Sequence, residues 1–195
     1  MAFLALIAGP IGSGKTTVCS SLYDILLVSG YLVSGLIQET ERNENGLPIR
    51  IGFRDLATRK SWPWTERQSS FPIPPPFVFP EQPLQKAIAR LSEAAAEGRR
   101  PLILDEIGLL EIESEKGFLA WVREYLSHED SFLIASVRKG REESLLNILV
   151  DKAPERKSLE AGVFEIEGKN RDACLDSALK WTLRHCPTQN GNVYL

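Results

Sequence analysis

Near its N-terminus the sequence reads Gly9-Pro10-Ile11-Gly12-Ser13-Gly14-Lys15-Thr16, which fits the phosphate-loop pattern G-x-x-x-x-G-K-[ST] at every fixed position. An apolar run over 3–8 precedes this loop, as in a strand covered on both faces, and residues 15–27 follow with the apolar spacing of a helix. In such a context backbone N–H groups of the loop converge on phosphate oxygens, and the helix dipole favours anions. We therefore expect a nucleotide-binding site in an α/β fold.

The residues of this loop have distinct expected roles. Lys15 is expected to reach the β- and γ-phosphates, and the Thr16 hydroxyl is expected to ligate Mg²⁺. The alternative is a glycine turn that happens to precede a helix start, but the flanking strand and helix favour a nucleotide site. The predicted nucleotide-binding residues of the loop are Gly9, Pro10, Ile11, Gly12, Ser13, Gly14, Lys15, Thr16 and Thr17.

A second decisive stretch is the apolar run 101–104, which ends at Asp105 and Glu106. Ligands bind beyond the C-terminal ends of strands in open α/β sheets. We expect Asp105 to hold Mg²⁺ through a water, and Glu106 to orient and polarise the attacking water. The alternative is that the two acids begin a solvated loop. The phosphate loop upstream favours the catalytic interpretation. Lys15 and Glu106 are therefore predicted to be catalytic residues.

Elements along the chain alternate in type. We expect strands at 3–8, 31–37, 101–104, 132–135 and 163–166, and helices at 15–27, 84–97, 116–127, 142–150 and 171–185. Turn residues at 43–46 predict a hairpin over 36–54, and 61–83 is expected to be irregular because it holds seven of the twelve prolines. This order predicts a doubly wound, mostly parallel P-loop sheet in one domain over 1–195, with the hairpin and a Pro-rich loop inserted at about 36–83.

The adjacent acids also indicate which type of P-loop sheet forms. In the RecA-like branch a strand lies between the phosphate-loop strand and the acidic strand, and a catalytic Glu commonly follows the Asp. The base-reading Asn-Lys-x-Asp of simple GTPases does not occur in the sequence, so guanine specificity by that route is not expected.

Composition narrows the class of protein. The 195 residues carry a formal net charge of −3, without the basic excess that nucleic-acid binding usually requires. Three cysteines without regular spacing indicate reduced thiols rather than a disulfide framework. The apolar opening lacks a basic leader and runs directly into the loop, and no apolar run reaches the length of a membrane span. We expect a cytoplasmic protein that does not bind membranes, and nothing in the composition indicates nucleic-acid binding.

Five runs in sequence carry a family resemblance: 9–17, the hairpin arms 35–42 and 50–53, 105–111 (Asp-Glu-Ile-Gly-Leu-Leu-Glu), and 170–171. In this order they resemble the cancer-related nucleoside-triphosphatase family of small RecA-like P-loop proteins. The resemblance implies slow hydrolysis of ATP, GTP and other nucleoside triphosphates with little base preference. The chain departs from the family pattern in two places. In the hairpin, only Glu39 and Arg42 match the family's T-E-E-x-R run. After the hairpin, the Pro-rich residues 71–83 stand in place of the family's G-K-Y-x-V segment.

Several further residues have two interpretations each. Ser136 either contacts the γ-phosphate or the water, or bonds its own backbone at a strand end. Arg42 either supplies positive charge to the transition state as an arginine finger or faces solvent, and Arg138 is its rival for that role. Asn170 and Arg171 either contact the base or ribose or simply open the last helix, with Asn170 as its N-cap.

The aromatic and histidine residues add little chemistry. Trp62 and Trp64 could stack on a base, although capping the edge of the core is favoured. His128 and His185 are the only histidines and lack partners at ligand spacing, so we expect neither a zinc site nor histidine catalysis.

Three classes of function fit these features. The favoured class is a magnesium-dependent hydrolase that converts nucleoside triphosphates to diphosphates and phosphate. The first alternative is a nucleotide or small-molecule kinase, although Glu106 beside Asp105 favours water activation and no Arg-rich lid is visible. The second alternative is a nucleotide-dependent switch or adaptor in which hydrolysis is a timer, although the usual GTP-specific loops are not recognisable in the sequence.

Overall fold

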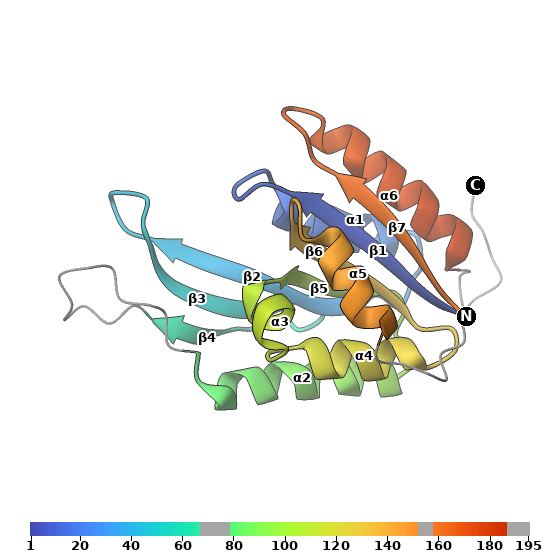
Figure 1. Ribbon diagram of the computed structural model, residues 1–195, viewed down its shortest axis with the longest axis horizontal. Helices are drawn as coiled ribbons and strands as arrows, with labels where there is room; N and C mark the ends of the chain where they lie inside the picture. The colour runs from blue at the N-terminus through green and yellow to red at the C-terminus, as the bar shows by residue number, and fades with distance from the viewer. Residues whose placement is uncertain (67–78, 152–157, 187–195) are drawn as a thin grey trace.

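The computed structural model of the chain describes residues 1–66, 79–151 and 158–186, and in it seven strands form one sheet (Figure 1). The strands are β1 (Ala2–Gly9), β2 (Ser34–Arg42), β3 (Pro48–Asp55), β4 (Ser61–Glu66), β5 (Leu102–Ile107), β6 (Phe132–Arg138) and β7 (Leu159–Glu165). The helices are α1 (Lys15–Val28), α2 (Glu81–Ala96), α3 (Leu109–Ser114), α4 (Leu119–Ser127), α5 (Glu142–Asp151) and α6 (Arg171–His185).

The strand order across the sheet is β4-β3-β2-β5-β6-β1-β7. The five strands from β2 to β7 in that order are parallel, whereas β3 and β4 are antiparallel to their neighbours and extend the sheet at one edge. This arrangement confirms the predicted mostly parallel α/β sheet with an inserted hairpin. β6 lies between the phosphate-loop strand β1 and the acidic strand β5, as expected for the RecA-like arrangement.

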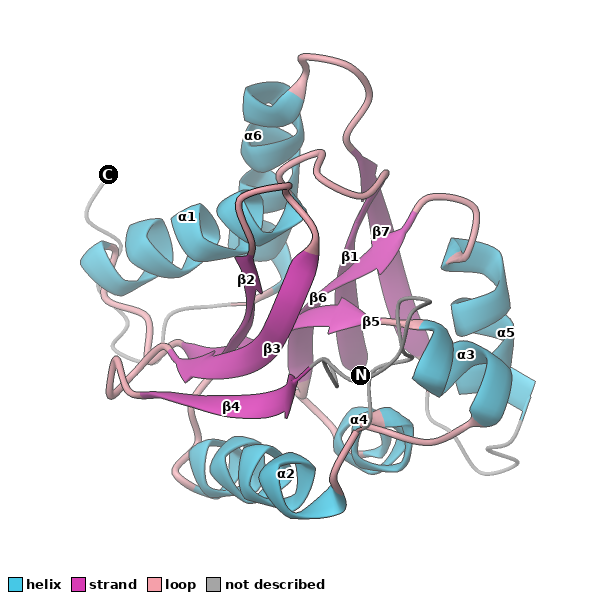
Figure 2. Cartoon of the chain, turned by 90° about the vertical axis from the view of Figure 1, so that its left-hand side faces the viewer, coloured by secondary structure: helices cyan, strands magenta, loops and turns pink. Residues whose placement is uncertain are grey.

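Helices cover both faces of the sheet (Figure 2), with α1 and α6 on one face and α2 to α5 on the other. Side chains of β1 alternate between the two cores: Leu4 and Leu6 belong to the core on the side of α2 to α5, whereas Ala5 and Ile7 belong to the core on the side of α1 and α6. All four are fully buried, which explains why this strand is a continuous apolar run. Burying one such Leu or Ile side chain contributes about 1.5–3 kcal/mol, so the C-terminal end of β1 is firmly anchored.

The prediction that residues 61–83 are irregular is wrong at its start, because β4 forms there. Trp62 and Trp64 hold this strand on β3, with ring centroids 6.0 and 4.8 Å from that of Phe53. The strand tolerates Pro63 because β4 is at the edge of the sheet, where a missing N–H costs little. α2 also starts earlier than expected, and residues 71–78 of the Pro-rich loop lie outside the described part of the chain.

Other differences are smaller. β2 begins at Ser34 rather than Tyr31 and continues directly into the hairpin, and the short helix α3 was not predicted. Cys19, Cys174 and Cys186 are buried free thiols. No described helix combines the length and the apolar character that a bilayer crossing requires.

Candidate active site

The phosphate loop joins β1 to α1 in a conformation that needs glycine. Gly12 and Gly14 have φ angles of 77° and 96°, a left-handed region that residues with a Cβ avoid. Gly14 is the N-cap of α1 and offers no side-chain bond to the first helical turn. The backbone N–H groups of that turn therefore lack a side-chain cap from the N-cap position, which suits an anion at the helix N-terminus.

Lys15 is the first residue of α1, and its side chain reaches back to the phosphate loop. Its Nζ donates to the carbonyl oxygens of Gly9 and Pro10, both at 3.0 Å. Burial lowers the pKa of Lys15, while the nearby carboxylates of Glu106 and Asp105 act in the opposite direction. The ammonium group is thus held where the loop would surround a phosphate, with two acids close by.

Asp105 is the buried acid of the site, with only 2% of the residue exposed. Its Oδ1 accepts a 2.7 Å hydrogen bond from the Ser136 hydroxyl, whereas its Oδ2 is buried without a hydrogen-bond partner among the described residues. Burial raises the pKa of Asp105, and the nearby hydroxyls of Thr16 and Ser136 oppose that rise. An unpartnered carboxylate oxygen beside a threonine hydroxyl fits the oxygen ligands that Mg²⁺ prefers.

Glu106 follows in a strained backbone conformation. Its φ is 65°, and the pairing of β5 with β6 shifts register between Leu104 and Ile107. A left-handed conformation costs a residue with a Cβ about 1–2 kcal/mol. This bulge lets the two adjacent acids differ, because Asp105 is buried while the Glu106 side chain is 28% exposed and borders the cleft.

Ser136 connects the two acids. Its hydroxyl donates to Asp105, and it accepts a 2.9 Å hydrogen bond from the backbone N–H of Glu106. The alternative interpretation, a bond to its own backbone, is not the bond that forms. Contact of Ser136 with a γ-phosphate or a water stays a prediction, because its proton is directed to Asp105 here.

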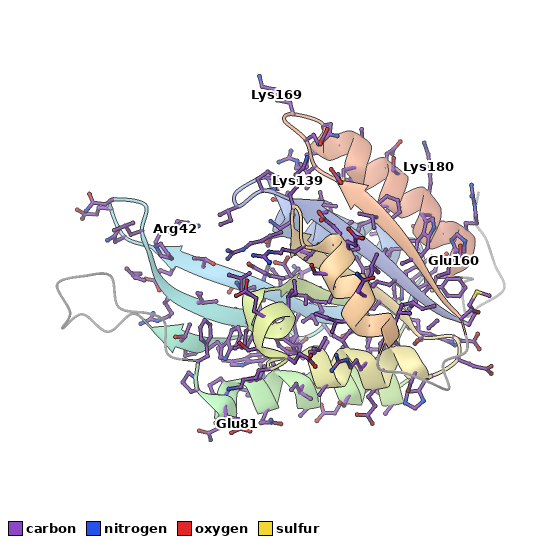
Figure 3. The ribbon with its side chains drawn as sticks, in the orientation of Figure 1. Arg42, Glu81, Lys139, Glu160, Lys169 and Lys180 are labelled. Atoms are coloured by element: carbon purple, nitrogen blue, oxygen red, sulfur yellow. The ribbon has the colours of Figure 1, made fainter. Side chains whose placement is uncertain are left out.

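The two candidate arginines lie in different places. Arg42 is at the outer end of the hairpin, where its Nη1 donates to the Gly46 carbonyl at 2.9 Å (Figure 3). Arg138 ends β6 beside the acidic pair, with Nε and Nη2 both 3.4 Å from Oε1 of Glu106. Both arginines therefore line one cleft with the phosphate loop, but of the two it is Arg138 that contacts Glu106.

A cleft of about 1020 Å³ joins these parts. The phosphate loop forms one wall, the hairpin strands β2 and β3 form another, and both acids, Ser136 and Arg138 lie along it. Its size is at the upper end of the range for small-molecule sites, which is ample for a nucleoside triphosphate.

Asn170 and Arg171 lie at the start of α6. The Asn170 side chain stays within its own turn, accepting from the N–H of Glu167 at 2.7 Å. Arg171 approaches the phosphate loop, since a Cβ added to Gly14 would lie 3.0 Å from its Cδ. Arg171 thus lies against the phosphate loop, whereas Asn170 shapes the turn before α6. Contact of either residue with base or ribose stays a prediction.

The two tryptophans pack into the core edge, as favoured from the sequence. Trp64 is buried and lies with ring centroids 4.8 Å from both Phe53 and Phe79. The ammonium group of Lys86 lies 4.6 Å from the centroid of the Trp62 ring.

Two polar residues of the site were given no role from the sequence. Glu111 is buried and accepts from the N–H groups of Gly108 and Phe118 at 2.9 and 3.1 Å, which orders the segment after the acids. A Glu three residues after a helix N-cap is a capping-box signal that could have identified it. Gln38 donates its Nε2 to Oε2 of Glu106 at 3.0 Å, a contact between residues 68 positions apart for which the sequence holds no local signal.

Comparison with known proteins adds independent evidence. A family model described as NTPase matches residues 5–179. The chain is 27% identical over 182 residues to the cancer-related nucleoside-triphosphatase homolog of Mus musculus, covering 87% of this chain and 90% of that protein. Two solved structures share its fold. The human cancer-related nucleoside triphosphatase has a TM-score of 0.70 at 23% identity, over 92% of this chain and 97% of that one. THEP1 from the hyperthermophile Aquifex aeolicus has a TM-score of 0.64 at 21% identity, over 92% and 98%.

Proposed function

This chain belongs to the NTPase family and is thus a nucleoside triphosphatase, and from that premise we propose that it hydrolyses ATP, GTP and other nucleoside triphosphates to diphosphates and phosphate, slowly, with little base preference and with Mg²⁺. The family match also confirms the resemblance inferred from the motifs. A nucleoside triphosphate is accordingly its substrate class.

One observation carries the proposed mechanism: the acidic pair and the phosphate loop border the same cleft, with Asp105 buried and Glu106 directed into it. Asp105 and Thr16 would hold the metal ion. When bound, Mg²⁺ supplies charge neutralisation on the β- and γ-phosphates. The unpartnered Oδ2 of Asp105 supports this assignment, because a buried carboxylate oxygen without a donor is unfavourable until a cation or proton meets it.

The remaining groups bind and orient. Lys15 exchanges the two loop carbonyls for phosphate oxygens, and Glu106 accepts a hydrogen bond from the attacking water and directs it at the γ-phosphate. Arg138 is the cation that we assign to the γ-phosphate in place of Arg42, because it already lies beside Glu106. A slow rate follows from this pairing, since Arg138 must leave Glu106 before it can stabilise charge on the phosphate.

Base tolerance follows from the residues that approach the loop. Arg171 offers a guanidinium plane, which can lie on the face of any base. Such a contact does not read the edges of the base. Asn170 supports it indirectly by holding the turn that precedes α6.

Phosphate release tests this function. ATP, GTP, CTP and UTP would each be incubated with wild type and with Glu106→Gln, with and without Mg²⁺, and with and without a panel of nucleoside monophosphates. We expect slow release from all four substrates that requires Mg²⁺, needs no acceptor and falls about 100-fold or more in the variant. Release that is negligible until one monophosphate is added would instead identify a phosphotransferase.

A further inference from the structure

Glu106 has two partners, one on each neighbouring strand. In the sheet β5 lies between β2 and β6, and Gln38 reaches Glu106 from β2 while Arg138 reaches it from β6. The two partners differ in distance and charge. The neutral amide of Gln38 lies 3.0 Å from Oε2, whereas the guanidinium of Arg138 lies 3.4 Å from Oε1.

These partners respond differently to a triphosphate. Arg138 borders the cleft with Lys15, and its side chain is 39% exposed. A guanidinium group binds phosphate oxygens in a two-pronged geometry and is attracted by the higher negative charge of a triphosphate. Gln38 carries no charge, so a phosphate does not draw it away from the carboxylate. We therefore expect a bound triphosphate to draw Arg138 away from Glu106 and to leave Gln38 as the partner of the carboxylate.

We propose that Gln38 is the positioning residue of the hydrolytic reaction, because it holds the Glu106 carboxylate toward the water once Arg138 has moved to the γ-phosphate. This assignment rests on the hydrolytic function proposed above. It concerns orientation only: Gln38 acts through Glu106 and need not touch the substrate.

The backbone around Glu106 makes such a partner necessary. The left-handed bulge and the bond from its N–H to Ser136 fix the main chain of Glu106 but not the end of its side chain. β2 pairs with β5 only over Ser34 to Leu36, and Gln38 is the next side chain on the Leu36 side of β2. Its amide continues the contact between the two strands where their backbone pairing has ended.

Two substitutions of Gln38 distinguish the effect of its hydrogen bond from the effect of its side-chain size. Gln38→Met keeps the length of the side chain but removes the donor, and Gln38→Glu keeps the shape but places a second carboxylate against Glu106. We expect kcat to fall about 10- to 100-fold in Gln38→Met, the range for losing a hydrogen bond to a charged group, and further in Gln38→Glu. KM and the affinity for Mg-ATP should stay close to wild type, because ground-state phosphate binding does not use this amide.

A matched control is available on α2. Gln85 also donates its amide to a carboxylate, that of Glu81 at 3.4 Å, on an exposed helix face. Gln85→Met should keep kcat. Equal kcat in wild type, Gln38→Met and Gln38→Glu would overturn the proposal, and so would a loss confined to KM.

A double-mutant cycle separates this proposal from the proposed function. Gln38→Met should cost no further activity in a Glu106→Gln background, measured by single-turnover phosphate release, because both residues then act through one group. If the losses of activity in the two single variants multiply in the double variant, Gln38 acts independently of Glu106, and the positioning role is refuted. If Glu106→Gln alone keeps wild-type turnover, the role assigned to Glu106 in the proposed function fails instead.

Discussion

Ser136→Ala tests the arrangement of the acidic pair most directly. The substitution removes one hydroxyl that makes two hydrogen bonds: a buried one to the Asp105 carboxylate at 2.7 Å and a partly buried one from the Glu106 N–H at 2.9 Å. Losing a hydrogen bond to a charged group costs about 1.5–3 kcal/mol, and leaving a buried N–H unpaired costs about 1–3 kcal/mol. We expect the free energy of unfolding to fall by roughly 3–5 kcal/mol at neutral pH, with a Tm lower by roughly 10 °C for a chain of this size.

The loss should depend on pH in a definite direction. Burial raises the pKa of Asp105 and the Ser136 hydroxyl opposes that rise, so the variant has the higher folded-state pKa. A carboxyl group whose pKa is higher in the folded state takes up a proton on folding, and the stability that it contributes is lost as pH rises through the folded pKa. The deficit of Ser136→Ala relative to wild type should therefore be larger at pH 8 than at pH 4, which is close to the ordinary pKa of an aspartate.

Urea unfolding at both pH values measures this deficit. Ser131→Ala is the matched control, because Ser131 is also buried but makes one bond to a neutral acceptor, the His128 carbonyl at 2.9 Å. That control should lose about 1 kcal/mol at either pH. Equal deficits for the two variants, unchanged between pH 4 and pH 8, would refute the inference that Ser136 holds an ionised Asp105.

Three further predictions test single residues of the site. Lys15→Ala should abolish triphosphate binding in a fluorescent-nucleotide titration, and unchanged affinity would remove Lys15 from the phosphate site. Asp105→Asn should raise the free energy of unfolding without nucleotide by about 1–2 kcal/mol, because a buried charge becomes a neutral amide. The same substitution should remove the Mg²⁺-dependent part of the nucleotide-induced Tm shift. A lower stability together with an intact Mg²⁺ effect would contradict this prediction. Arg138→Ala should lower kcat about 100-fold and more than Arg42→Ala does in the same phosphate-release assay, and the reverse order would assign the finger to the hairpin.

The parts of the fold that the sequence predicted are those with local signals. The first strand, the glycine loop and α1 follow one another within 28 residues, and each has its own pattern of apolar or glycine positions. The acidic strand was found in the same way, from an apolar run that ends in two acids. Such signals do not depend on which strands become neighbours, so they can be recognised in the sequence without knowledge of the sheet topology.

The parts that were missed depend on distant contacts. Pro63 and the surrounding prolines argued against a strand, yet β4 forms because Trp64 stacks on Phe53 and lies against Phe118. In the site, the bond between Ser136 and Asp105 requires that β5 and β6 be adjacent, which the order of elements along the chain does not specify. The sequence accordingly offers two interpretations of Ser136, and neither includes the bond to Asp105.

The hairpin is more than an insertion beside the active site. The pairing of β2 with β5 ends at Leu36, but β2 continues as one strand to Arg42. The part of β2 that directly follows Leu36 therefore still borders the two acids. Its Gln38 amide lies on Glu106, while the outer residues of the same strand line the wall of the cleft opposite the phosphate loop. A displacement of the hairpin therefore moves a partner of Glu106 together with a wall of the nucleotide cleft. Because one strand carries both, substitutions in the hairpin that alter how substrate is enclosed should also alter kcat, even where they touch neither the phosphate loop nor the acids.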